Sequence, residues 1–209
     1  MTPCTGLVYE LIFIDELQDF AGYDLDVLDR LFRSNITVVA VGDPRQATFS
    51  TNNGAKNKQF KGTDILGWIE QQAKAGRFQL EHRTDCFRSN QQICDFADAL
   101  YPNLPKTISK NATVTDHDGI IQIKAHETTA YFEKYRPVVL RHNRSAKTQG
   151  LPAVNIGLMK GRTFERVLIF ATGPMKEYLK TKDLAKAGDL AKLYVAVTRA
   201  KQSAAFVVD

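Results

Sequence analysis

Short apolar runs alternate with helical spacing in the N-terminal part of the chain. Leu11 to Ile14 form a fully apolar run that ends in acidic residues, as is typical of a buried parallel strand. Residues 36–41 form a second apolar run, which is closed by Gly42-Asp43-Pro44 and predicts a second strand. Between the two runs, helical spacing predicts a helix that carries Leu25, Leu28, Leu31 and Phe32.

A polar stretch and a second helical pattern follow. Residues 51–62 are polar and contain glycine, which predicts a loop. Thr63 can cap a helix that Gly76 stops. Its apolar positions are Ile65, Leu66, Trp68 and Ile69. Phe78 and Leu80 alternate with polar residues and predict a strand.

The alternation begins again after residues 82–88, where we expect a domain boundary. Helices are predicted at 91–100 and over most of 183–200, and strands at 119–124, 137–141, 167–171 and 204–208. Strands interleaved with helices indicate an α/β fold with mainly parallel sheets.

Composition and charge narrow the class of protein. The 209 residues include 44% hydrophobic and 24% charged residues, which is ordinary for a globular protein, and no apolar run is long enough to span a membrane. Three scattered cysteines and the absence of a secretory signal favour a reducing, cytoplasmic location. Lys plus Arg number 28 against 23 for Asp plus Glu, so the net charge is +5. A basic balance favours a nucleic-acid partner, with a merely solvated surface as the alternative.

Two acidic residues directly follow the first predicted strand. The carboxyl ends of parallel strands are where α/β proteins place ligands. There Asp15 can hold a Mg²⁺ ion, and Glu16 can orient or deprotonate a water that attacks a γ-phosphate. The alternative is that both acids only stabilise the N-terminus of a following helix.

The second predicted strand ends in a similar polar segment. Gly42 and Pro44 indicate a tight turn, and Gln46 is an uncharged donor and acceptor that could sense a phosphate. A simple polar turn is the alternative, but two neighbouring strand ends with such groups favour a site.

These segments carry a family resemblance. Asp15 to Asp19 (DELQD) and Gly42 to Phe49 (GDPRQATF) resemble the Walker B motif and the following motif of UvrD/Rep-type superfamily 1 helicases, ATP-driven motors that walk on single-stranded DNA. Four further segments resemble later motifs of the family in the right order, namely 87–93 (FRSNQQI), 137–143 (PVVLRHN), 160–164 (KGRTF) and 194–200 (YVAVTRA). The resemblance spans about residues 8–208.

The resemblance implies a role for each matching residue. Asp15 would hold Mg²⁺, Glu16 would activate water, and Gln46 would couple the γ-phosphate of ATP to DNA. Arg88 and Arg199 would reach the γ-phosphate from the second RecA-like domain, where an arginine finger is worth about 10³ to 10⁵ in rate. Gly161 would lie at the nucleotide. The residues on single-stranded DNA would be Phe49, Arg141, Asn143 and Lys160. Phe49 would stack on a base, and the alternative is that it is a core aromatic residue.

The chain departs from the family pattern most clearly at the phosphate-binding loop. No G-x-x-x-x-G-K-[ST] motif occurs in the sequence, and this loop normally supplies the backbone cradle and the lysine for the phosphates. We therefore expect residues 1–83 to be the C-terminal half of a first RecA-like domain and 84–209 to be a complete second one without a large accessory insertion. The missing N-terminal segment would be a partner, and this chain alone would bind MgATP weakly.

Smaller departures leave two functions open. Thr163 stands where the family usually has Glu, and Asn155 and Gly157 stand where it has Thr and His. Thr51 replaces a second aromatic residue that follows Phe49. The chain is either the C-terminal part of an ATP-dependent DNA helicase or a non-enzymatic module that binds nucleic acid or protein.

Overall fold

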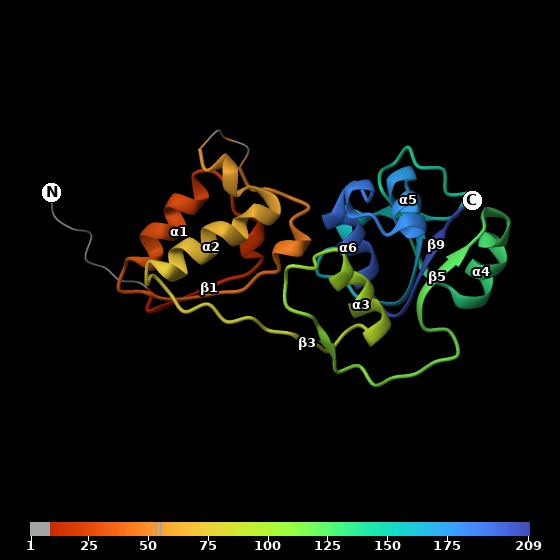
Figure 1. Cartoon of the computed structure of the whole chain (residues 1–209), viewed down its shortest axis with the longest axis horizontal. Coiled ribbons are helices and arrows are strands. Elements are labelled where there is room, and N and C mark those ends of the chain that lie inside the picture. Colours follow the sequence, from red (N-terminus) through yellow and green to blue (C-terminus); the bar gives the residue numbers. More distant parts are fainter. Residues whose placement is uncertain (1–8, 53, 55) are drawn as a thin grey trace. The chain divides into compact units, whose positions relative to one another are not determined.

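The computed structural model describes residues 9–52, 54 and 56–209, which form two compact units divided in the chain between Glu81 and His82 (Figure 1). Cys4 and two positions of the expected loop 51–62 lie outside the described residues. Among the described residues, no helix has the length and apolar character needed to cross a membrane. The division lies close to the expected boundary at 83/84, but the identity of each unit as a partial or complete RecA-like domain stays a prediction.

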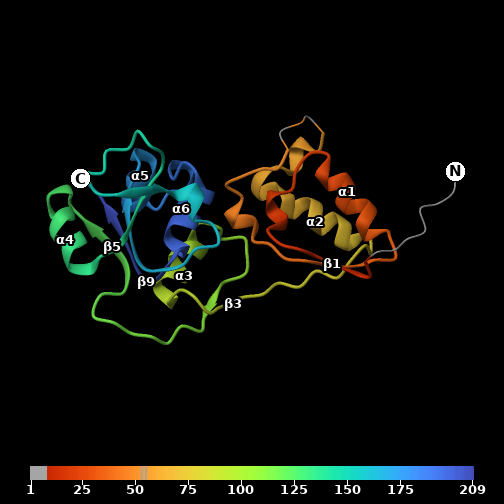
Figure 2. The ribbon, with the colours of Figure 1, turned by 180° about the vertical axis from the view of Figure 1, so that it is seen from behind.

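The first unit is built on two parallel strands, as the apolar runs predict. β1 (Leu11–Ile14) pairs in register with β2 (Thr37–Ala40). Helices α1 (Asp24–Phe32) and α2 (Ile65–Lys74) lie on the same side of β1 in both views (Figures 1 and 2). Their apolar faces bury one core with the inward strand residues, and its buried members are Ile14, Leu17, Leu25, Leu28, Ile65, Trp68 and Ile69.

The other face of this small sheet stays exposed and apolar. Alternate strand residues point to opposite faces, so the residues between the core positions face outward. Leu11 is 45%, Phe13 73% and Val39 41% exposed. Parallel sheets are normally covered on both faces, so an exposed apolar face is unusual for a parallel pair of strands.

Two expectations for this unit are wrong in detail. Residues 77–84 form no strand, and Phe78 instead packs edge-on against Phe32 of α1 at 4.9 Å between ring centroids. The alternation around Phe78 therefore reflects one anchoring aromatic residue in an irregular segment. Thr63 is not the helix cap, because a short 3₁₀ turn (Gly62–Asp64) precedes α2 and Asp64 takes the cap position.

The second unit contains a five-stranded sheet in which every pairing is parallel. The strand order is β5-β9-β8-β6-β7. The strands are β5 (Gly119–Ile123), β6 (Val138–Arg141), β7 (Ala153–Asn155), β8 (Phe164–Phe170) and β9 (Ala200–Val207). A separate parallel pair joins β3 (Asp85–Cys86) to β4 (Ile108–Ser109). The expected α/β class with parallel sheets is confirmed.

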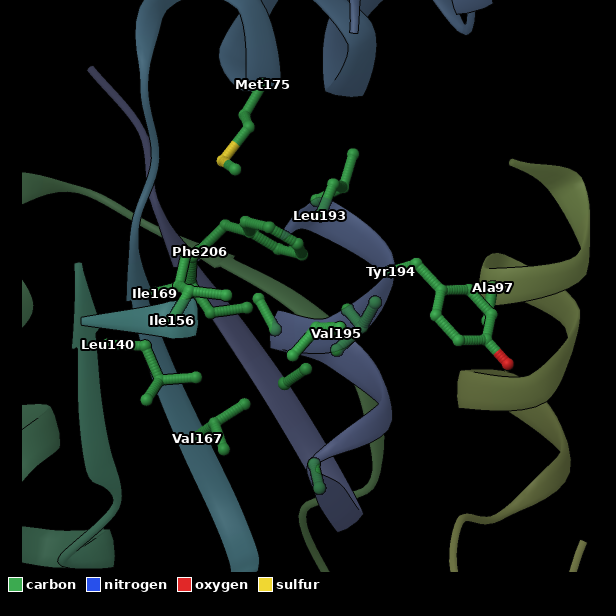
Figure 3. Packing of buried hydrophobic residues seen from close by; sticks show 14 of the residues in the cluster. Ala97, Leu140, Ile156, Val167, Ile169, Met175, Leu193, Tyr194, Val195 and Phe206 are labelled. Atoms are coloured by element: carbon green, nitrogen blue, oxygen red, sulfur yellow. The ribbon is translucent and has the colours of Figure 1, made fainter. Parts of the chain in front are cut away.

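Helices cover both faces of the large sheet. α3 (Gln91–Ala99), α5 (Gly173–Thr181) and α6 (Leu190–Thr198) lie on one side, and α4 (Thr128–Tyr135) lies on the other (Figures 1 and 2). Val167, Ile169 and Phe206 face Leu193 and Val195 of α6 (Figure 3). The alternate positions of β8 and β9 pack in the α4 core, and they are Leu168, Phe170, Ala205 and Val207. Burial on both faces explains why these strands are nearly continuous apolar runs.

The C-terminal elements differ from their expected bounds. The helix expected over most of 183–200 is interrupted, because Gly188 has a φ of +73° and a Cβ there would lie 2.8 Å from Pro174 Cβ. Only a 3₁₀ turn (Leu184–Lys186) and α6 are helical. The strand expected at 204–208 already begins at Ala200, so that α6 passes into β9 through Arg199 alone.

Candidate functional site

Asp15 and Glu16 lie directly after β1, where the chain turns sharply. Glu16 has a left-handed backbone with a φ of 53°, which costs a non-glycine residue on the order of 1 kcal/mol or more. Its backbone N–H donates to Asp15 Oδ1 at 2.8 Å, and its carbonyl accepts from Asp19 N at 2.9 Å. The turn ends the strand and begins the 3₁₀ helix η1 (Leu17–Asp19). Backbone strain of this kind is concentrated at functional sites.

Gln18 joins the two strand ends, although the sequence analysis gave it no role. The side chain is buried, with 2% exposure. Its Nε2 donates to Glu16 Oε2, and its Oε1 accepts from the backbone N–H of Asp43 at 2.9 Å. The amide of Gln18 therefore holds the Glu16 carboxylate against the turn that follows β2.

Gly42 allows this close approach. A Cβ at position 42 would lie 2.5 Å from Gln18 Oε1 and 3.0 Å from the backbone N of Leu17. The neighbouring N–H of Leu17 also donates to Val41 O at 3.0 Å. The glycine before Asp-Pro was thus the sequence signal for a buried side chain packed against this turn.

Asp43 and Gln46 continue the network. Asp43 caps the 3₁₀ helix η2 (Pro44–Gln46), and its Oδ1 pairs with Arg45 Nε at 2.8 Å. Gln46 Nε2 donates to Asp43 Oδ2 at 3.2 Å. We call Glu16, Gln18, Asp43 and Gln46 the strand-end network. It brings the expected Glu16 and Gln46 into one hydrogen-bonded group.

The carboxylates at this edge fit a magnesium ion. Asp15 is exposed, and one of its two oxygens accepts the Glu16 N–H. Mg²⁺ takes oxygen ligands and is usually held by one or two carboxylates, substrate phosphates and waters. Among the described residues, no group of three or more His, Cys, Asp or Glu side chains could enclose a metal ion. Asp15 could supply one carboxylate ligand to such an ion.

Phe49 is exposed on a segment that is fixed at its far end. The ring is 64% exposed, so it is not the core aromatic that was the alternative for this position. Two residues later, Thr51 Oγ1 donates to Asp24 Oδ2 at 2.5 Å and accepts from Ala21 N at 3.2 Å. The exposed ring is available for stacking.

In the second unit, the segment after β3 is joined by hydrogen bonds to the start of β9. Arg88 Nη1 donates to Thr198 O at 3.2 Å, and Ser89 Oγ donates to Ala200 O at 2.7 Å. Asn90 contributes two more bonds, from its backbone N to Lys201 O at 2.9 Å and from Nδ2 to Gln202 O at 2.7 Å. Residues that are about 110 positions apart in the chain thus form one structure that carries both expected arginines.

Arg199 is buried inside the second unit, with 1% exposure. Its Nη1 lies 3.5 Å from Met159 O and 3.4 Å from Arg162 O, and its Nη2 lies 3.3 Å from Thr198 Oγ1. The guanidinium therefore bonds to both ends of the turn that contains Lys160 and Gly161. Gly161 has a φ of +72°, which favours glycine at this turn.

Arg141 and Asn143 lie at the carboxyl end of β6. Arg141 Nε donates to Asn155 Oδ1 at 3.1 Å, so Asn155, one of the departures from the family pattern, positions an expected contact residue. Asn143 Oδ1 accepts from Ser145 N at 3.0 Å and shapes its own turn.

Comparison with known proteins decides the family. A sequence profile described as the viral superfamily 1 RNA helicase core domain matches residues 2–208. The chain belongs to this helicase family. No curated protein sequence matches it significantly.

Solved helicase structures are similar to this helicase core in fold. A structure of the PRRSV helicase matches with a TM-score of 0.53 and 22% identity over 93% of this chain and 34% of the other. The arterivirus nonstructural protein 10 helicase in complex with DNA gives a TM-score of 0.52 and 19% identity, over 93% and 38%. At these identities the similarity concerns the fold alone. The chain spans about a third of the length of these helicases.

These findings confirm superfamily 1 and the helicase-type parallel α/β fold. The UvrD/Rep type stays a prediction, and so do the individual roles of the site residues. The helicase core brings expected residues together in two places. One is the strand-end network, and the other is the set of hydrogen bonds that joins residues 88–90 to residues 198–202 and so links the segments of Arg88 and Arg199.

Proposed function

We propose that this helicase core is the hydrolytic and translocating part of a motor that couples ATP hydrolysis to movement along single-stranded nucleic acid. The strand-end network carries the proposal, because it ties a strained glutamate to a glutamine at the carboxyl ends of two neighbouring parallel strands. Ligands of α/β proteins bind at such ends.

Each residue of the first unit has a distinct role in this proposal. Asp15 holds Mg²⁺, which supplies neutralisation of phosphate charge when it is bound. Glu16 orients the attacking water and accepts its proton, and Gln18 fixes the Glu16 carboxylate in place. Gln46 contacts the γ-phosphate, and its bond to Asp43 transmits that contact to the turn after β2.

Arginines serve phosphoryl transfer in the second unit. Arg88 stabilises the charge that spreads over the transferred phosphoryl oxygens, with Gly161 close to the nucleotide. Arg199, which is buried with 1% exposure, joins it only after leaving its present position. Arg199 also closes the Lys160–Gly161 turn through the carbonyls of Met159 and Arg162. Nucleotide-dependent movement of Arg199 would thereby change a turn whose Lys160 contacts nucleic acid.

Binding of the ATP phosphates needs further protein groups. The 209 residues contain no Walker A motif, so the backbone cradle and the lysine for the β- and γ-phosphates would come from a segment outside residues 1–209. The exposed apolar face of β1 and β2 offers a surface on which the remainder of such a domain packs.

Nucleic acid is the proposed track. Phe49 stacks on a base, and Arg141, Asn143 and Lys160 contact the backbone, with the net charge of +5 favouring a polyanion. The family description favours RNA, whereas the UvrD/Rep-type resemblance and the DNA complex of the arterivirus relative favour DNA. The alternative function is a non-enzymatic module whose nucleic-acid or protein binding is insensitive to ATP.

Hydrolysis is tested on the chain joined to its phosphate-binding segment. Glu16→Gln should lower nucleic-acid-stimulated kcat by about 10² or more, the usual loss on removing a general base. Glu70→Gln on α2 removes the same charge from an exposed position of the same unit and should leave kcat unchanged. Equal hydrolysis by Glu16→Gln and the parent protein would overturn the role of Glu16, and no hydrolysis by the parent would favour the binding module.

Binding is tested on the present chain with fluorescent single-stranded RNA and DNA of equal length. Phe49→Ala should weaken binding about 5-fold or more, as expected for the loss of a stacking contact, and Arg141→Ala should reduce the salt dependence. Lys74→Ala, at the end of α2, is the matched control for a lost charge. Absence of binding at physiological salt would contradict the nucleic-acid track.

A further inference from the structure

Two cysteines of the second unit contact the backbone of the same residue, Ser89. Cys86 lies in β3 and is partly exposed, whereas Cys94 lies in α3 and is buried. The backbone N–H of Ser89 donates to Cys86 Sγ at 3.4 Å, and Cys94 Sγ donates to the carbonyl of Ser89 at 3.7 Å. Neither thiol takes part in the proposed hydrolysis.

The surroundings of Cys86 favour its thiolate. Its pKa is lowered to about 5, chiefly by the neighbouring Cys94 side chain, against the effect of burial. The N–H groups of Ser89 and Arg88 and the Arg88 guanidinium lower it further. The neighbouring Cys86 side chain and burial raise the pKa of Cys94, which therefore stays a thiol. This combination of an accessible thiolate and an adjacent thiol is typical of a peroxide-reactive pair.

We propose that Cys86 and Cys94 form an oxidation site that takes hydrogen peroxide as its substrate and closes to a disulfide beside Arg88. The geometry that supports it is that both sulfurs contact the backbone of Ser89, which lies between the two cysteines in the chain. It does not depend on ATP hydrolysis, so it can fail or succeed independently of the proposed function.

The chemistry is balanced in two steps. The Cys86 thiolate attacks one oxygen of the peroxide, the O–O bond breaks, and the released hydroxide takes up a proton to leave as water. This step leaves Cys86 as the sulfenic acid. The Cys94 sulfur then attacks the Cys86 sulfur, the S–O bond breaks, and a second water leaves with the Cys94 proton. In total, two thiols are oxidised and one peroxide is reduced to two waters.

Disulfide formation would move the segment that carries Arg88. Both cysteines are free, and an S–S bond of about 2.05 Å is much shorter than any non-bonded contact between two sulfurs, so the segment between the two cysteines must adjust when the bond forms. Oxidation also removes the thiolate that accepts the Ser89 N–H and the thiol that donates to the Ser89 carbonyl. Arg88 and Ser89 lie in this segment and bond to Thr198 O and Ala200 O. We therefore expect oxidation to weaken the bonds that Arg88 and Ser89 make to the end of α6 and the start of β9.

The first test measures thiol reactivity by iodoacetamide labelling and peptide mapping of the Cys4→Ser chain. The rate constant for Cys86 should change less than about 2-fold between pH 6.5 and 8.5, because its thiolate is already formed. An ordinary thiol with a pKa near 8.5 would accelerate about 50-fold over the same range. Such an acceleration at Cys86 would overturn the proposal, and no variant of either cysteine is needed for this measurement.

The second test uses stoichiometric hydrogen peroxide on the same protein. A single Cys86–Cys94 disulfide should form within the monomer, with the loss of two hydrogen atoms by intact mass and faster amide hydrogen exchange at residues 88–90. In Cys94→Ala, a dimedone adduct should form at Cys86 instead, because the resolving thiol is gone. Unchanged thiols, or disulfides only between separate molecules, would overturn the pairing.

Discussion

Gln18 Oε1 accepts the backbone N–H of Asp43 at 2.9 Å, and this bond joins the ends of the two strands that carry the proposed hydrolytic residues. The same side chain donates to the Glu16 carboxylate through Nε2. The buried amide both donates and accepts a hydrogen bond, so its removal leaves a donor and an acceptor without their partner. Gln18 is therefore a positioning residue, and its loss should affect both stability and the orientation of Glu16.

Gln18→Ala should destabilise the first unit by about 1–3 kcal/mol, the usual cost of leaving a partly buried donor without its acceptor. Trp68, the single tryptophan of the chain, lies 5% exposed in the core of this unit and reports its urea unfolding by fluorescence. Gln71→Ala at an exposed position of α2 removes the same side chain and should stay within about 0.5 kcal/mol of the parent. Equal midpoints for the two variants would show that the Gln18 bonds carry no net stability.

Gly42→Ala tests the close approach between the turn and Gln18. The new methyl group would lie 2.5 Å from Gln18 Oε1, so the glutamine must move and lose its bond to Asp43. We expect a loss of about 1–3 kcal/mol, as for overpacking in a core.

The double variant Gln18→Ala/Gly42→Ala distinguishes a collision from a backbone effect. Once the glutamine side chain is absent, the methyl group has room on that side. The combined loss should therefore be smaller than the sum of the single losses by at least about 0.5 kcal/mol in the Trp68 unfolding assay. Strict additivity would mean that Gly42 is required for a reason other than Gln18.

Local patterns predicted β1, β2, β5, β6, β8 and β9, because apolar runs and turn residues act over short distances, but they missed the short strands β3, β4 and β7. Gln18 was missed since its importance arises from Asp43, 25 positions away, and a polar residue in an acidic segment carries no local sign of burial. Phe78 was misassigned for the same reason, because its partner Phe32 lies on a distant helix. Burial of Arg199 could not be predicted either, since arginine is seldom buried unless paired and its partners are backbone carbonyls.

Arg199→Ala should destabilise the second unit by about 2 kcal/mol or more, because the carbonyls of Met159 and Arg162 lose a charged donor and a cavity is left in place of the buried side chain. Lys201→Ala removes a neighbouring cation whose ion pair with Glu165 is solvent-exposed, and it should cost less than about 1 kcal/mol. Hydrogen exchange of α6 and β9 measures both losses in the second unit. Comparable protection in the two variants would contradict a structural role for Arg199, and it would leave any loss of hydrolysis in Arg199→Ala attributable to catalysis.

Stability of the second unit should depend on pH through His117. This ring stacks on Tyr135 with 3.9 Å between centroids, and its Nε2 lies 2.9 Å from Tyr131 Oη. Burial lowers the pKa of His117, and the positive charges of Arg166 and Lys134 lower it further, against the opposing effect of Asp116 and Asp118. The unfolded chain therefore binds the proton more readily than the folded one. The contribution of neutral His117 to the free energy of unfolding is therefore fully present above about pH 6.5, the ordinary pKa of histidine. It is lost as the pH falls from there through the lower pKa that His117 has in the folded chain.

His117→Phe keeps an aromatic ring against Tyr135 but cannot take up a proton. The thermal midpoint of the second unit, measured by hydrogen exchange or circular dichroism, should fall less between pH 7 and pH 5 in this variant than in the parent. His126→Gln provides the control, because His126 is exposed on the short turn before α4 and its replacement should leave the parent's pH dependence intact. If His117→Phe and the parent lose stability equally over this range, the acid sensitivity arises from other groups. A flat profile only in the His117 variant would assign the acid sensitivity to protonation of this partly buried ring.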